Sequence, residues 1–261
     1  MNNETLRTRE FIFAFLFGPA RLISRNQAGE LHGRLCDSLR LDDFSFHYES
    51  TELQAGGTAS TVRPFKIQFA RRDGSGLLGA VIECTSLQEP MRLLLKHSGP
   101  PSLETTCQYF DTLAEALIPL QEWQRVHAEA RILTQCQPRV GGSAVDFLKN
   151  NLLRFSAADL EQIGGSLSFC GLKFDVPATG ETDSLSGPSR QVQVEVLRED
   201  PGSVYIEVIT AWTQWVQRMQ GHIPVLDVSA VRQIDQAPSK YLRDCYDFLS
   251  DKVCSLGRGG G

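Results

Sequence analysis

Residues 65–84 read FKIQFARRDGSGLLGAVIEC, two apolar-rich segments on either side of a Gly-rich turn signal. Phe65, Ile67 and Phe69 alternate with polar residues, and the run from Leu77 to Cys84 is largely apolar. Alternation with a period of two is typical of a strand with one buried face, and a short Gly-containing link joins strands in hairpins. The segment therefore predicts an antiparallel hairpin.

A second segment later in the chain matches this hairpin at a constant spacing. Phe65 aligns with Val192, Ile67 with Val194, Phe69 with Val196 and Asp73 with Asp200, all at an offset of 127 residues. The predicted elements around the two hairpins also recur in the same order. Recurrence at a fixed offset favours an internal duplication.

The order of predicted elements in each half is βαβββα. In the first half, strands at 11–17, 44–48, 65–69 and 77–84 are combined with helices over 22–39 and 106–120. In the second half, strands at 126–133, 167–174, 192–196 and 204–209 are combined with a helix from Ser143 and another after Pro238-Ser239. Links too short for parallel crossovers predict the α+β class, as antiparallel sheets with helices packed on one face. We expect repeats at 1–122 and 123–256 and a glycine tail at 257–261.

This order resembles a sporadically distributed, functionally uncharacterised bacterial family with tandem TATA-binding-protein-like repeats. The similar features are the opening EFIFAFLFGP at residues 10–19, the segment VLDV at 225–228, and the final helix near 241–254. The resemblance implies a fold and no reaction.

Composition narrows the classes of partner. The 261 residues include 26 basic and 31 acidic side chains, a net charge of −5, so no broad cationic surface is expected for nucleic acid or anionic membranes. The apolar run at 11–17 is far too short to span a bilayer and lacks the flanks of a signal peptide. Seven scattered cysteines fit neither a disulfide framework nor zinc knuckles and favour a reducing cytoplasm.

Motifs for chemistry are absent from the sequence. The dinucleotide, P-loop, zincin and hydrolase fingerprints are missing, which predicts no enzyme activity and no cofactor. His32 and Cys36 have the spacing of two helical metal ligands, but no second pair completes a site, so no metal is expected and Cys36 is interpreted as a core thiol. Asp227 is interpreted as a strand-end acid, and Arg71-Arg72 as the rim of a hairpin.

Two features remain as candidate sites. Trp212 and Trp215 either seal the junction between the repeats or anchor a partner protein. Arg258, Gly259, Gly260 and Gly261 are similar to the Arg-Gly-Gly ending of ubiquitin, because a backbone without side chains can extend through a narrow enzyme tunnel.

The sequence thus predicts a non-enzymatic protein-interaction protein of the bacterial cytoplasm, with an accessory or defence operon as one setting. Its partner is expected to be a protein, not nucleic acid or membrane. One alternative is a ubiquitin-like modifier that meets activating and conjugating enzymes through the carboxylate of Gly261. Another alternative is a small-ligand binder that uses a cleft between the repeats.

Overall fold

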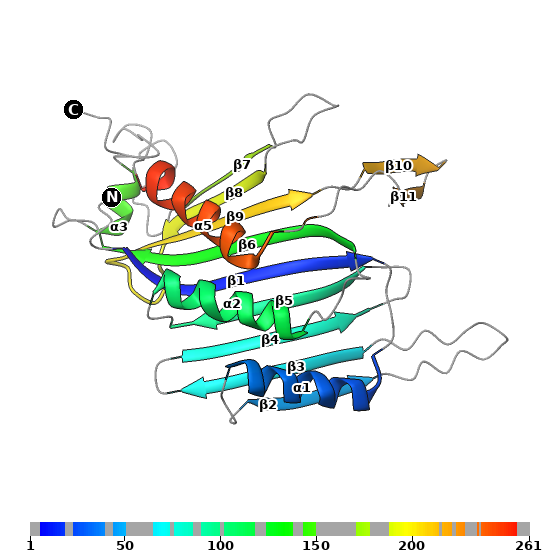
Figure 1. Ribbon diagram of the computed structural model, residues 1–261. Helices are drawn as coiled ribbons and strands as arrows, with labels where there is room; N and C mark the ends of the chain where they lie inside the picture. Colours follow the sequence, from blue (N-terminus) through cyan, green and yellow to red (C-terminus); the bar gives the residue numbers. More distant parts are fainter. Residues whose placement is uncertain are drawn as a thin grey trace. The chain divides into compact units, whose positions relative to one another are not determined.

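The computed structural model of the chain is shown in Figure 1. It describes residues 6–18, 23–39, 44–50, 65–73, 76–85, 90–99, 102–117, 124–137, 143–149, 171–177, 188–213, 216–220, 223–227, 234 and 236–254.

The elements of the first half are β1 (Leu6–Gly18), α1 (Arg25–Leu39), β2 (Ser45–Ser50), β3 (Phe65–Asp73), β4 (Gly76–Cys84), β5 (Met91–Ser98) and α2 (Leu103–Leu117). Those of the second half are β6 (Gln124–Cys136), α3 (Ala144–Leu148), β7 (Gly171–Val176), β8 (Ser189–Val196), β9 (Val204–Thr213), β10 (Val216–Gln220), β11 (Ile223–Asp227), α5 (Pro238–Phe248) and the π-helical turn η4 (Leu249–Val253).

Most strands belong to one large sheet. Among the described residues, nine strands are hydrogen-bonded in the order β2-β3-β4-β5-β1-β6-β9-β8-β7, and β10 pairs with β11 separately. β3 and β4 are antiparallel, as the sequence predicts, and their register places Phe65 opposite Cys84. The pairs β2–β3, β4–β5 and β7–β8 are antiparallel as well. The α+β class is therefore confirmed.

The first half contains one strand more than the predicted βαβββα order. β5 lies between β4 and α2, so four strands follow α1 where the sequence predicted three. Three consecutive leucines in MRLLLKHS hide the period of two in the sequence. In the structure, burial alternates along the strand, with Met91, Leu93, Leu95 and His97 buried. The pairing of β5 with β4 decides which leucines face the core.

Phenylalanines of β1 form the centre of the core. Phe11, Phe13, Phe15 and Phe17 are each at most 1% exposed, which confirms the predicted buried strand at 11–17. The rings of Phe13 and Phe15 meet edge to face, with centroids 4.6 Å apart. Tyr241 of α5 stacks on Phe13 at 5.9 Å. Aromatic pairs in this geometry add to the stabilisation that burial alone provides.

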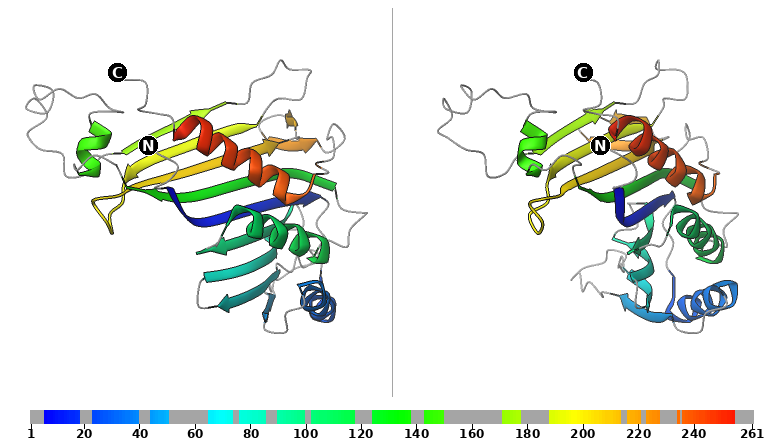
Figure 2. Two further views of the ribbon diagram at one scale, coloured as in Figure 1. Left: turned by 60° about the vertical axis from the view of Figure 1, so that its left-hand side comes forward. Right: turned by 90° about the vertical axis from the view of Figure 1, so that its left-hand side faces the viewer.

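Helices α1 and α2 lie on the same side of β2–β5 (Figure 2). α1 buries Ala28, Leu31 and Leu35, a stripe at helical spacing. α2 begins three residues before the predicted Thr106, because the Ser102 side chain caps it and accepts the Thr105 N–H at 3.1 Å. The opposite side of these strands carries no helix among the described residues.

The helix starts predicted in the second half are also confirmed. The Ser143 hydroxyl accepts the Asp146 N–H at 3.1 Å, and α3 begins at the next residue. α5 begins at Pro238 and buries Tyr241, Leu242 and Cys245.

The chain divides into two compact units. Unit 1 contains Met1–Glu10, Arg131–Thr210 and Arg243–Gly261, and unit 2 contains Phe11–Ala130 and Ala211–Leu242. β1, β6, β9 and α5 each contribute residues to both units. The repeat boundary expected after residue 122 stays a prediction, and the tail expected at 257–261 lies outside the described residues.

Candidate functional site

Trp212 is the predicted site residue that the structure describes. It is half-buried in β9, and its ring meets that of Tyr241 with centroids 4.8 Å apart and planes at 60°. Because Tyr241 also stacks on Phe13, Trp212 extends an aromatic cluster inside unit 2. Trp215 lies outside the described residues, as do Arg258, Gly259, Gly260 and Gly261, so the conjugation tail stays a prediction.

The His32–Cys36 pair is held by packing in α1. His32 Nε2 lies 2.8 Å from the Phe44 carbonyl oxygen, and its ring lies parallel to that of Phe69 at 6.3 Å. Cys36 Sγ is 3.7 Å from the same Nε2 atom. Cys36 is half-buried, so it is more accessible than the core thiol that the sequence predicted, because the helix turns it to the edge of the buried stripe. Within the described residues, no group of three or more His, Cys, Asp or Glu side chains could hold a metal ion.

The other residues considered from the sequence do not converge. Asp227 ends β11, opposite Val216 of β10. Arg71 and Arg72 lie near the end of β3, where Arg71 is half-buried and Arg72 is exposed.

A polar surface lies across β7 and β8 in unit 1. Their register places Lys173 opposite Gln193, Asp175 opposite Gln191, and Gly171 opposite Glu195. The intervening residues Val192, Val194 and Val196 are buried, and Arg190, which shares their side of the strand, contacts Phe248 of α5. Since side chains alternate between the two sides of a strand, Gln191, Gln193 and Glu195 point away from α5.

Side-chain hydrogen bonds hold this surface in place. Gln191 Nε2 donates to Asp175 Oδ1 at 2.7 Å, and Gln193 Nε2 donates to Glu195 Oε2 at 2.9 Å. These bonds link side chains that are neighbours across strands or two residues apart, so they restrict rotamers that would otherwise be free in solvent.

Strands β9 and β6 add a buried charge to the same surface. Tyr205 donates its hydroxyl hydrogen to Glu207 Oε2 at 3.0 Å, and Arg131 forms an ion pair with Glu207 Oε1. Glu207 lies on the same side of β9 as Tyr205, because the two are two residues apart in the strand, and it is only 8% exposed. A carboxylate this buried requires compensation, which the arginine and the tyrosine supply. The polar face is hereafter the set Asp175, Gln191, Gln193, Glu195, Tyr205, Glu207 and Arg131.

The environment of Tyr205 fixes its protonation state. Burial raises the pKa of the Tyr205 hydroxyl far above its ordinary value of about 10, and the carboxylates of Glu207 and Glu195 raise it further. The hydroxyl therefore remains a hydrogen-bond donor over the whole physiological range.

Sequence reasoning missed the polar face because its members are dispersed. Arg131 and Glu207 are 76 residues apart, and strand pairing alone brings them together. The available signals were the spacings Gln193–Glu195 and Tyr205–Glu207, which place polar side chains on one side of a strand.

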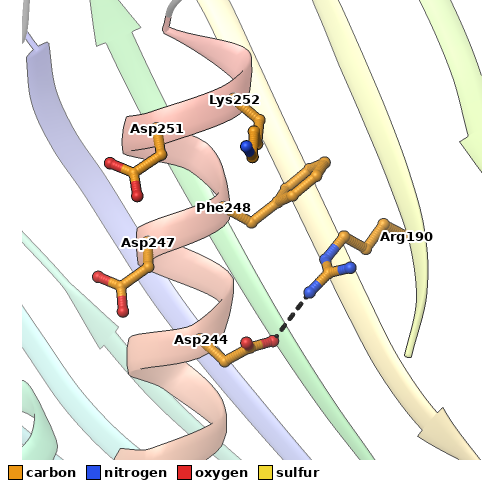
Figure 3. Close-up of a pocket in the computed structure, with 6 residues that line it drawn as sticks. All are labelled: Arg190, Asp244, Asp247, Phe248, Asp251 and Lys252. Carbon is orange, nitrogen blue, oxygen red and sulfur yellow. Dashed lines mark hydrogen bonds and ion pairs between the residues drawn. The ribbon is translucent and has the colours of Figure 1, made fainter. Parts of the chain in front are cut away.

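A groove of about 470 Å³ lies on the other side of unit 1, beside α5 (Figure 3). The Arg190 guanidinium lies 4.6 Å from the centroid of the Phe248 ring, and its Nη2 donates to Asp244 Oδ2 at 3.1 Å. In Figure 3, Asp247 and Asp251 point away from Arg190. Arg190 thus links β8 to α5 through a cation–π contact with Phe248 and an ion pair with Asp244.

Comparisons with known proteins gave no match. No family model, no curated protein and no solved structure matches this chain. The resemblance to the tandem-repeat family thus stays a prediction from order and pattern. In the described part of the chain, no helix is both long enough and apolar enough to cross a membrane.

Proposed function

We propose that this protein is a non-enzymatic protein-interaction protein and that it binds its protein partner through the polar face of unit 1. The observation that carries this proposal is the ordered Arg131–Glu207–Tyr205 cluster on the side of the strands that faces away from α5. Tyr and Arg are the side chains that most often contribute strongly to protein interfaces.

Preorganisation supports a binding role for these residues. Tyr205 is half-buried, and its hydroxyl is already hydrogen-bonded to Glu207. A partner that contacts the Tyr205 ring therefore binds a side chain that has already lost most of its rotational freedom, which lowers the entropy cost of binding. Glu195 is half-buried at the same surface and accepts a hydrogen bond from Gln193. Its carboxylate would pair with a basic side chain or an amide of the partner.

The tandem-repeat architecture is part of the same proposal. Reading the sheet inward from its two ends gives β2-β3-β4-β5-β1 and β7-β8-β9-β6, so β1 and β6 take equivalent central places. The hairpins matched at an offset of 127 residues contribute β3–β4 and β8–β9 to these two series. This order supports two related repeats, 1–122 and 123–256, of the TATA-binding-protein-like kind.

We propose the bacterial cytoplasm as the compartment. No disulfide joins any two of the cysteines that the structure describes, which are Cys36, Cys84, Cys107, Cys136, Cys245 and Cys254. Seven scattered cysteines without a disulfide framework support a reducing environment.

Affinity capture with the full chain tests the proposal. Wild-type protein should capture a protein partner from native lysate, and Glu195→Lys should reduce that capture about tenfold, because it reverses a charge on the polar face. Asp247→Lys is the matched control: it makes the same charge change at an exposed position of α5 and should leave capture unchanged. Capture of nucleic acid instead of protein, or equal capture by both variants and wild type, would contradict the proposal.

A further inference from the structure

A row of alternating charge crosses four strands of unit 2. The register places Glu49 of β2 opposite Lys66 of β3, Lys66 opposite Glu83 of β4, and Glu83 opposite Arg92 of β5. With neighbouring strands about 4.8 Å apart, the four side chains span about 14 Å. The row reads acid, base, acid, base along a nearly straight line perpendicular to the strands.

This charged row lies on the side of the strands without helices. The residues next to it in sequence, Phe65, Ile82 and Leu93, are buried. Phe69, on the same side of β3 as Phe65, contacts His32 of α1, and His97, on the same side of β5 as Leu93, contacts Thr106 of α2, so the buried side is the one that the helices cover. Alternation therefore places the charged row on the opposite side, where Glu49 is exposed and Lys66, Glu83 and Arg92 are half-buried. The described helices that lie wholly within unit 2, α1 and α2, are both on the other side of these strands (Figure 2).

The charges in this row are complementary to those of a second copy of the row. A two-fold axis parallel to the strands, passing between β3 and β4, would place β2 of one copy over β5 of the other. Glu49 then faces the partner copy's arginine at position 92, and Lys66 faces its glutamate at position 83. A two-fold axis along the row, perpendicular to the strands, would instead place each charged residue over the same residue of the other copy, so that like charges face each other. We infer that a second copy of this chain docks on this face, in the arrangement with the axis along the strands.

The next rows of the same face allow the two sheets to approach. Val81 of β4 lies opposite Leu94 of β5, and Ala70 of β3 lies opposite Gly79 of β4. Under the same two-fold axis, the small residues Ala70 and Gly79 face each other across the interface. Small side chains at this place permit face-to-face sheet packing at about 10 Å. In the row of Val81 and Leu94, the same axis places Val81 over the partner copy's glutamine at position 68 and Leu94 over its histidine at position 47.

Local partners are already present for Glu49, Glu83 and Arg92, and the dimer adds to these pairs without replacing them. Arg92 Nη1 donates to Glu83 Oε1 at 3.3 Å, and His47 Nε2 lies 2.9 Å from Glu49 Oε1. Because water reaches both pairs in the single chain, each contributes little on its own. When a second sheet covers them, water is excluded and alternating charges from the other copy surround each side chain.

A charge-swap experiment with the full chain tests the dimer. Sedimentation velocity at about 100 µM should show wild-type dimers that weaken as salt rises from about 50 to about 500 mM. Lys66→Glu and Glu83→Lys alone should each raise the dimer Kd about tenfold or more, because each variant makes two like-charged contacts per dimer. An equimolar mixture of the two variants should form heterodimers, since both contacts are then complementary again.

Controls separate the interface from folding. Arg34→Glu reverses an exposed charge on α1, on the covered side of the strands, and should dimerise like wild type. Circular dichroism checks that each variant is folded. If a charge-reversal variant does not fold, Lys66→Gln or Glu83→Gln replaces it, because these substitutions only neutralise the charge. The neutral variants should weaken the dimer less than the charge reversals. A wild-type chain that is monomeric throughout, or folded variants that fail to form heterodimers when mixed, would overturn the inference. This inference concerns unit 2 and does not depend on the polar face of unit 1, so the two can fail separately.

Discussion

Replacing Arg131 with methionine removes the cation that faces the buried carboxylate of Glu207, while it keeps most of the apolar length of the side chain. Breaking a fully buried ion pair costs about 3–5 kcal/mol, because the remaining charge is left in a poorly solvated place. The side chain of Glu207 is 10% exposed and that of Arg131 is 38% exposed, so water reaches the pair from one side. We therefore expect Arg131→Met to lower the free energy of unfolding by about 2–3 kcal/mol.

The double variant Arg131→Met with Glu207→Met should recover most of that loss. The pair is imperfectly satisfied, because Arg131 Nε has no hydrogen-bond partner among the described residues, and apolar replacement of such a pair is often close to neutral. Urea unfolding, followed by circular dichroism, measures all four members of the double-mutant cycle. The reasoning is refuted if Arg131→Met costs less than about 0.5 kcal/mol, or if the double variant is less stable than Arg131→Met alone.

Three further expectations concern other parts of the molecule. The pKa of Tyr205 is higher in the folded than in the unfolded chain, so its stabilisation is complete below about pH 10 and is lost as pH rises further; Tyr205→Phe should flatten this decline in urea titrations at pH 9 to 11. Burial raises the pKa of the Cys245 thiol to about 12, so brief maleimide treatment followed by peptide mass mapping should label half-buried Cys36 and leave Cys245 unmodified; rapid labelling of Cys245 would contradict its burial. Trp212→Ala should cost about 2 kcal/mol in thermal unfolding and Trp212→Phe clearly less, because a phenyl ring can still meet Tyr241; equal losses would argue against the ring contact.

Local signals in the sequence determined the elements whose pattern is carried by neighbouring residues. The alternation of Phe65, Ile67 and Phe69, with its turn, predicted the β3–β4 hairpin and the antiparallel class. Ser143 and Pro238 predicted two helix starts, because caps act on the first turn of the helix that they begin.

Tertiary structure decided what depends on strand pairing. The leucines of β5 have no distinguishable period by themselves, and only pairing with β4 selects Leu93 and Leu95 for the core. Cys36 was interpreted as a core thiol but lies half-buried, because the helix position relative to the sheet sets how wide the buried stripe becomes.

The candidate sites depend on pairing even more strongly. Arg131 pairs with Glu207, and Lys66 lies opposite Glu49 and Glu83, across strands whose register no local pattern specifies. In a sheet, a shift of one residue moves every side chain to the other side, so the sequence determines which strands have a polar side, and register alone determines which charges meet.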